Sequence, residues 1–140
     1  MKDMEKTIGP LVDKQKVAFI GSVGQDGFPY VKAMLAPRKR EGIRVFYFTT
    51  NTHSMRVDQY RKNAKACIYF CDKRFFRGVM LRGTMEVLTD AVHKEMIWQE
   101  GDTMYYKEGV GDPDYCVLRF TATDGRYYRD FSSEDFTVCP

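Results

Sequence analysis

Hydrophobic and polar residues alternate with a period of two along several segments, as in a strand with one buried face. Together with shorter apolar runs, this pattern predicts strands over 17–23, 28–36, 43–48, 64–71, 79–88, 115–121 and 126–131. Asp26-Gly27 and Asp124-Gly125 predict hairpin turns, because this dipeptide tolerates the positive φ angles that such turns need. Strands that follow one another as hairpins favour an antiparallel sheet that is closed, or nearly closed, on itself.

Three further segments have the spacing of helices. Residues 3–14 carry apolar side chains at helical spacing, although Gly9-Pro10 is expected to interrupt that helix. A helix over 55–62 is predicted to begin after Ser54 as its N-cap, and another spans 90–100. We therefore expect a mainly β protein with six or seven antiparallel strands and two or three peripheral helices.

Length and composition restrict the class of protein further. The chain has 140 residues and a mass of 16.3 kDa, so we expect a single domain over residues 1–140. Lys and Arg (22) exceed Asp and Glu (19) by only three, which is too small a bias to favour nucleic acid or an anionic membrane as a partner. No apolar stretch approaches the ~20 residues of a membrane-spanning helix, and no signal peptide is recognised. The expected location is the cytoplasm.

The four cysteines and two histidines do not suggest a metal centre. Cys67 and Cys71 are four residues apart in an apolar run, which is neither a C-x-x-C redox pair nor a zinc-knuckle spacing. We expect all four cysteines to be free thiols, and two histidines are too few for a His-rich metal site.

The most informative segment for chemistry runs from a strand through 49–54 into the helix over 55–62. The first turn of a helix leaves backbone N–H groups unpaired and carries partial positive charge. Thr50 and Ser54 add side-chain donors there, and Arg56 adds a full charge. These are the components of a phosphate site, although a capped helix with an exposed arginine is the simpler interpretation of this segment alone.

A second cation lies on the predicted strand over 28–36. Lys32 shares a strand face with Tyr30 and Met34, whereas Val31, Ala33 and Leu35 share the other face. A lone lysine is normally solvated, but this one is flanked by groups that suit an anionic ligand lying over the sheet.

Taken together, these segments resemble the FMN-binding split-barrel family whose namesake is pyridoxamine 5′-phosphate oxidase. The resemblance is closer to the general-stress-protein branch and covers nearly the whole chain. It includes Asn63–Phe70, Gly83–Glu86 and Asp112–Tyr115, in addition to the strand and turn segments above. Each motif is short, so the resemblance depends on their order and spacing.

The resemblance implies a split β-barrel that forms a homodimer, with FMN in a groove at the interface. Lys32 would lie beside the isoalloxazine and phosphate, Ala33 and Met34 would back the ring, Thr49 and Thr50 would contact its edge, and Ser54 and Arg56 would hold the phosphate. The cofactor-binding set that the resemblance implies is Lys32, Ala33, Met34, Thr49, Thr50, Asn51, Ser54 and Arg56.

Function remains open between three alternatives. The first is a flavin-dependent oxidoreductase acting on a small-molecule substrate, and the second is a non-enzymatic flavin carrier or stress-linked flavin-binding protein with the same pocket. The third is a haem-handling relative that uses His53, a residue that is more simply a solvent-facing part of the turn. The C-terminal Arg-x-His of the namesake enzymes has no counterpart after Asp124, so oxidation of pyridoxamine phosphate is not implied.

Overall fold

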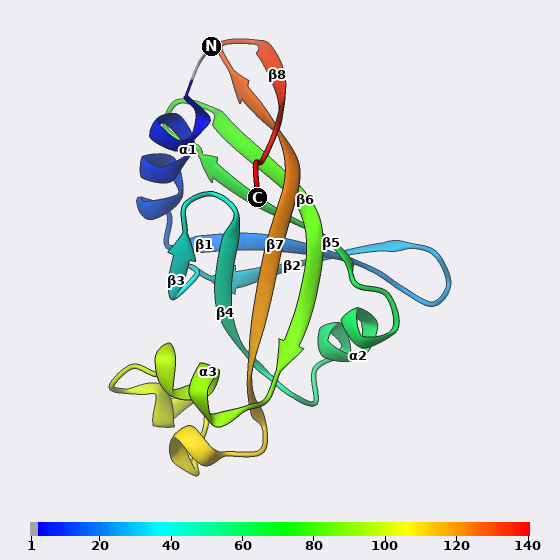
Figure 1. The fold of residues 1–140 in the computed structure, drawn as a ribbon, viewed down its shortest axis with the longest axis vertical. Coiled ribbons are helices and arrows are strands. Elements are labelled where there is room, and N and C mark those ends of the chain that lie inside the picture. Colours follow the sequence, from blue (N-terminus) through cyan, green and yellow to red (C-terminus); the bar gives the residue numbers. More distant parts are fainter. Residues whose placement is uncertain (1–2) are drawn as a thin grey trace.

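The computed structural model describes residues 3–140, which form one eight-stranded antiparallel sheet with three α-helices around it (Figure 1). The strands are β1 (Val17–Val23), β2 (Pro29–Leu35), β3 (Lys39–Glu41), β4 (Val45–Asn51), β5 (Lys65–Asp72), β6 (Arg77–Leu88), β7 (Tyr115–Arg129) and β8 (Ser132–Thr137). The helices are α1 (Met4–Asp13), α2 (Met55–Lys62) and α3 (Ala91–Met96), with 3₁₀ turns at Asp102–Met104 and Gly109–Gly111.

The strands lie in the order β2-β1-β5-β6-β7-β4-β3, and β8 pairs with β7. Every pairing is antiparallel, and β6 and β7 extend along the long axis of the molecule (Figure 1). This confirms the mainly β, antiparallel split-barrel prediction. The strand count differs from the expected six or seven in two ways. The strands expected over 115–121 and 126–131 are one strand, β7, and two strands that were not expected, β3 and β8, are present.

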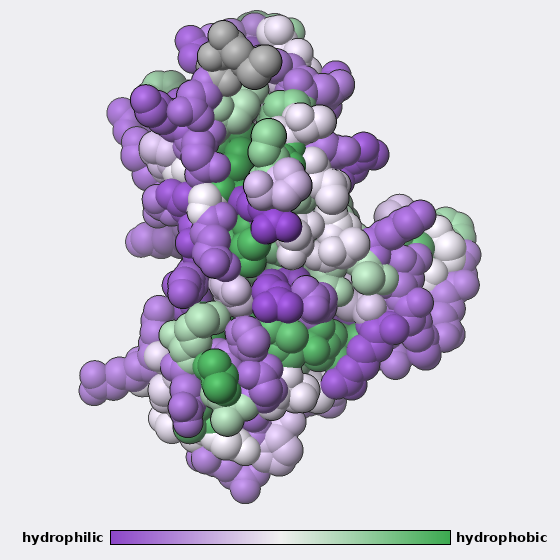
Figure 2. Space-filling view, in the orientation of Figure 1, coloured by the Kyte–Doolittle hydropathy of each residue, from purple (hydrophilic) through white to green (hydrophobic). Residues whose placement is uncertain are grey.

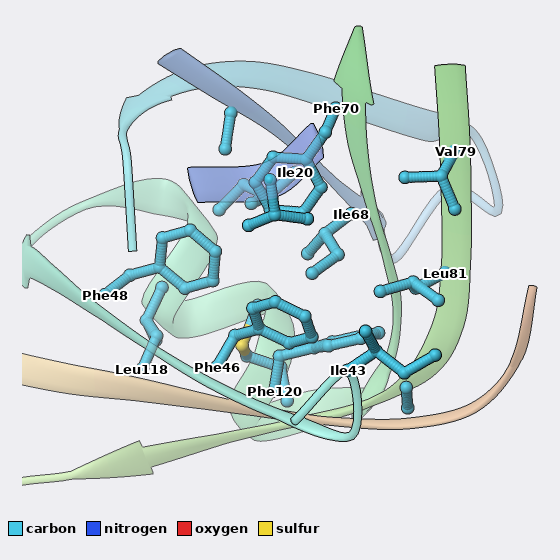
Figure 3. Close-up of a cluster of buried hydrophobic side chains, with 14 of the residues drawn as sticks. Ile20, Ile43, Phe46, Phe48, Ile68, Phe70, Val79, Leu81, Leu118 and Phe120 are labelled. Atoms are coloured by element: carbon cyan, nitrogen blue, oxygen red, sulfur yellow. The ribbon is translucent and has the colours of Figure 1, made fainter. Parts of the chain in front are cut away.

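The inner face of the sheet encloses the main hydrophobic core. Phe46, Phe70 and Phe120 lie at its centre, with ring centroids 5.8 and 6.3 Å from that of Phe46 (Figure 3). Helices α1 and α2 add side chains to the same core, namely Ile8, Leu11, Val12, Val57 and Tyr60. Burial of this apolar surface is the dominant favourable term in folding and holds both helices on the sheet.

A second core lies on the opposite face of β4 and β7. The segment 97–112 covers that face and contributes Ile97 and Tyr106, which pack with Tyr115 and Val117 of β7. Tyr106 and Tyr115 have ring centroids 4.7 Å apart, and Trp98 lies 5.2 Å from Tyr115. Strand β4 is therefore covered on both faces.

The outer surface is mostly polar in the view of Figure 2, where hydrophilic side chains surround smaller hydrophobic areas. Within residues 3–140, no helix combines the length and the apolar character that crossing a bilayer requires.

Helix α1 is continuous, so the expected interruption at Gly9-Pro10 is wrong. Proline removes one backbone donor from the helix, but Pro10 lies on the exposed side. Ile8, Leu11 and Val12 are buried in the main core on the other side. Their burial outweighs the local cost of the proline.

The hairpin expected at Asp124-Gly125 is also wrong, because both residues lie inside the single long strand β7. Gly125 is needed there for space rather than for a turn, since a Cβ atom would come within 2.8 Å of the Met80 carbonyl oxygen. The chain turns later, at Asp130 and Phe131, whose φ angles are +50° and +62°. The Asp-Gly dipeptide therefore predicted a turn at a position where the glycine is required by the close approach of two strands.

The helix expected over 90–100 ends at Met96, and the chain then forms the 97–112 segment around a buried ion pair. Both guanidinium Nη atoms of Arg38 donate to the Asp102 carboxylate at 2.9 Å, and the Gln99 N–H donates to the same carboxylate at 2.9 Å. The side chains of Arg38 and Asp102 are only 10% and 5% exposed. These donors hold the pKa of Asp102 below its usual value, although burial opposes them.

Replacing Asp102 by Asn is expected to destabilise the protein by about 3–5 kcal/mol, because it leaves the Arg38 charge buried without its partner. The lowered pKa means that this stabilisation is complete above the ordinary carboxyl pKa of about 4 and is lost as pH falls through the lower folded value. Chemical denaturation between pH 3 and 7 measures both effects.

The matched control is Asp135→Asn, which breaks the Arg126–Asp135 pair, whose side chains are 56% and 72% exposed. That change is expected to cost less than about 1 kcal/mol. Equal losses in the two variants would contradict an anchoring role for the buried pair.

Candidate functional site

The alternation of β4 determines which threonine faces which core. Thr50 continues the inward series of Phe46 and Phe48 and is buried, whereas Thr49 continues the outward series of Val45 and Tyr47. Thr49 accordingly faces Tyr106 of the 97–112 segment. Burial raises the pKa of Tyr106, and the Thr49 hydroxyl partly offsets that effect. The structure thus separates the two threonines that were expected to act together.

Thr50 and Arg56 do lie together at the start of α2. The Arg56 Nη2 donates to Thr50 Oγ1 at 3.4 Å, while its Nε is buried and has no hydrogen-bond partner within residues 3–140. Ser54 caps the helix as predicted, with its Oγ accepting from the Val57 N–H at 3.4 Å. A buried guanidinium donor without an acceptor, beside a helix N-terminus, suits a phosphate group.

The turn between β4 and α2 is bound to Asp114, just before β7. Asn51 Nδ2 donates to Asp114 Oδ2 at 2.8 Å, and the backbone N–H of His53 donates to Oδ1 at 3.1 Å. The His53 ring lies on the same oxygen, with an Nδ1–Oδ1 distance of 2.6 Å, while its side chain is 78% exposed. Asn51 is therefore committed to the turn, and His53 is solvent-facing with one ring nitrogen fixed.

Strand β2 places the other predicted residues at an edge of the sheet. Lys32 and Met34 lie opposite Ile20 and Ala18 of β1 and so share the inward face, with Lys32 exposed and Met34 half-buried. Ala33 lies on the outward face. The expected division of this strand into two faces is confirmed.

Helix α2 connects the two parts of the candidate site through β1. Tyr60 donates to the Gly21 carbonyl oxygen at 2.9 Å, and Ser22 donates to Gln59 Oε1 at 2.5 Å, both in buried positions. Burial raises the pKa of Tyr60 strongly. Ser22 in turn lies opposite Tyr30, two residues before Lys32, so the helix that carries Arg56 is packed beside the strand pair that carries Lys32.

A separate cleft of about 1090 Å³ lies at another part of the molecule and contains none of the predicted residues. It is bounded by the start of α1, the β3–β4 turn and the β7–β8 hairpin, with Met4, Ile43 and Phe136 among its apolar lining. The Glu5 carboxylate also lines it and accepts from the Ile43 N–H at 2.9 Å. Thr50, Ser54 and Arg56 lie at the β4–α2 turn and not in this cleft.

Comparison with known proteins identifies the family of this chain. The family model described as pyridoxamine 5′-phosphate oxidase matches residues 4–129. The chain belongs to the pyridoxamine 5′-phosphate oxidase family. No match is found among the curated proteins.

Among the solved structures, one similar protein is from Clostridium acetobutylicum and is described as related to general stress protein 26 of Bacillus subtilis. It is 41% identical, with a TM-score of 0.88, and the match covers 96% of this chain and 94% of that one. General stress protein 26 from Bacillus anthracis has the same fold at 16% identity, with a TM-score of 0.79 over 96% of this chain and 98% of that one. The predicted family and its general-stress branch are therefore confirmed.

A more distant structural neighbour is a heme binding protein from Mycobacterium smegmatis. It is 12% identical with a TM-score of 0.76, and the match covers 98% of this chain but only 59% of that one. At this identity the likeness shows the fold alone.

Two features of the site were not predicted from the sequence. The first is the role of Asp114, which the sequence offers only as part of a short motif. Antiparallel pairing of β4 with β7 brings Asn51 opposite Tyr115, and this register places Asp114 beside the turn. The second is the position of Thr49, whose side chain faces Tyr106 of the 97–112 segment rather than sharing the side of Thr50.

Proposed function

We propose that this protein binds FMN, with the phosphate at the β4–α2 turn, and that it acts as a flavin-dependent oxidoreductase. The observation that carries this proposal is the buried Arg56 Nε without an acceptor, held beside Thr50 and the N-terminus of α2. A buried polar group without a partner is costly, and a phosphate oxygen would remove that cost. Family membership supports the same cofactor.

Different residues of this chain would contact different parts of the cofactor. Arg56 and Ser54 would hold the phosphate through charge-assisted and neutral hydrogen bonds, while the exposed Lys32 on β2 would supply a second positive charge toward the cofactor. When bound, FMN supplies hydride and electron transfer, and the protein supplies its position and surroundings.

A second copy of this chain is proposed to complete the site, as in the family. The outward faces of β1, β2 and β5 carry exposed apolar side chains, namely Val17, Phe19, Val31, Leu35 and Tyr69, and strand register places them beside one another. Val17 lies opposite Leu35, Gly21 lies opposite Val31, and Phe19 lies opposite both Ala33 and Tyr69. A continuous exposed apolar face of this kind is typical of a protein–protein interface.

Replacing Arg56 by Ala is expected to weaken FMN binding by about one to two decades, since charge-assisted hydrogen bonds contribute roughly 1.5–3 kcal/mol. Riboflavin, which lacks the phosphate, is expected to lose little. Titration of both flavins by fluorescence or calorimetry gives the two dissociation constants.

Arg61→Ala is the matched control, because Arg61 is exposed in the last turn of the same helix. It is expected to leave both constants near the wild-type values. Equal losses of FMN and riboflavin in the Arg56 variant would exclude Arg56 from the phosphate site.

Anaerobic bleaching of the bound flavin by NAD(P)H supports an oxidoreductase, whereas a flavin that stays oxidised with every donor supports a carrier.

The native protein is expected to be a homodimer, with a mass in sedimentation at micromolar concentration of about twice 16.3 kDa. Val31→Glu is expected to give a folded monomer, because it places a charge in the proposed interface. Val92→Glu on α3 is the control, since the exposures of Val31 and Val92 are 73% and 74%. A Val31→Glu variant that still dimerises as the wild type does would contradict this interface.

Haem is a second candidate ligand, and the geometry of His53 favours it. Because the Asp114 carboxylate fixes Nδ1, Nε2 is directed away from that contact on an exposed ring, and imidazoles that bind iron are commonly oriented in this way. The visible spectrum of the protein purified from cells separates the candidates. Flavin absorbs in the blue and gives a yellow solution, whereas haem gives a Soret band.

A further inference from the structure

The β4–α2 turn, defined as residues 51–54, is held by one carboxylate from a distant part of the chain. Asp114 accepts three hydrogen bonds from it through its side chain, from the Asn51 amide, the His53 N–H and the His53 ring. Its backbone carbonyl oxygen accepts a fourth, from the Thr52 N–H at 2.8 Å. Each residue from 51 to 53 is thus tied to Asp114.

Asp114 is itself held in place by hydrogen bonds with the residues that precede β7. Its N–H donates to Asp112 Oδ1 at 2.9 Å, and the other oxygen of that carboxylate accepts from the Glu108 N–H at 3.0 Å. The buried Lys94 Nζ donates to the Asp112 carbonyl oxygen at 3.0 Å, and the Tyr115 hydroxyl donates to the Lys94 carbonyl oxygen at 2.7 Å. The turn is therefore connected to the second core, which is rigidly packed around Tyr115.

The charge state of Asp114 suits a residue that holds several hydrogen-bond donors of the turn. Burial opposes ionisation, but the hydrogen bonds from His53 and Asn51 prevail and hold the pKa of Asp114 below its usual value. An ionised carboxylate accepts and does not donate, so it orders donors around itself.

We propose that Asp114 is a positioning residue for the flavin phosphate, acting through the turn rather than by contact with the ligand. The turn leads directly into the first turn of α2, so its conformation sets the direction of the Ser54 hydroxyl, the free N–H groups and Arg56. This inference rests on the proposed FMN function. Removing the Asp114 carboxylate is therefore expected to weaken FMN binding. Electrostatics alone gives the opposite expectation, because removing a negative charge close to a phosphate should tighten binding.

The test compares the dissociation constants of FMN and riboflavin in Asp114→Ala, Asp114→Asn and the wild type. Asp114→Ala is expected to weaken FMN about tenfold relative to riboflavin, because the oriented phosphate donors are lost. Asp114→Asn keeps an acceptor for His53 and is expected to recover most of that loss. The ratio of the two constants is informative because a merely structural defect would weaken both flavins alike.

Asp58→Ala is the matched control, since Asp58 is an exposed carboxylate in the first turn of α2 whose ion pair is with Lys62. It is expected to leave FMN binding unchanged or slightly tighter. Unfolding midpoints show whether each variant folds. If Asp114→Ala does not fold, His53→Ala removes one of the same hydrogen bonds and is expected to give a smaller loss, again confined to FMN.

Equal or tighter FMN binding in a folded Asp114→Ala variant overturns the positioning role, as does an equal loss of both flavins. A wild-type protein that binds no FMN, or that binds FMN and riboflavin equally, contradicts the proposed function instead. The two failures are therefore distinguishable.

Discussion

The candidate site depends on β4 being covered on both of its faces. Phe46 and Phe48 pack in the main core, while Val45 and Tyr47 pack under the 97–112 segment. A strand held in this way cannot slip by one residue, because a slip would exchange its two buried faces. The residues at its end and just after it, from Thr50 to Arg56, therefore have a fixed position.

The same constraint explains how a distant segment reaches the site. The β4–β7 register sets Asp114 against the turn, and the buried Arg38–Asp102 pair holds the 97–112 segment that leads to it. The proposed phosphate site therefore depends on three separate parts of the chain, namely the β4–α2 turn, Asp114 and Arg38. Such an arrangement places a polar turn on a rigid scaffold, and rigidity is what keeps binding groups oriented.

Local patterns predicted the elements well where one interaction dominates. The bounds of β1 and α2 and the cap at Ser54 follow from alternation and capping preference. The Asp124-Gly125 hairpin was wrong because a glycine required by a neighbouring strand and a glycine required by a turn look alike in sequence. The 97–112 segment was not foreseen in detail, since its position comes from Arg38, about sixty residues earlier in the chain.

The site was predicted only in part for a related reason. Thr50, Ser54 and Arg56 are close in sequence, and the helix N-terminus that unites them is a local feature. Thr49 was grouped with Thr50, but adjacent residues of a strand face opposite ways. The outward-facing residue is Thr49, which lies beside Tyr106. Asp114 required knowledge of strand pairing, which periodicity does not supply.

A crystal structure of the protein with FMN would locate the phosphate directly. We expect the phosphate within hydrogen-bond distance of the Arg56 guanidinium and the Ser54 hydroxyl, with the ring against a second copy of the chain. A phosphate bound elsewhere, such as in the cleft lined by Met4, Ile43 and Phe136, would contradict this expectation.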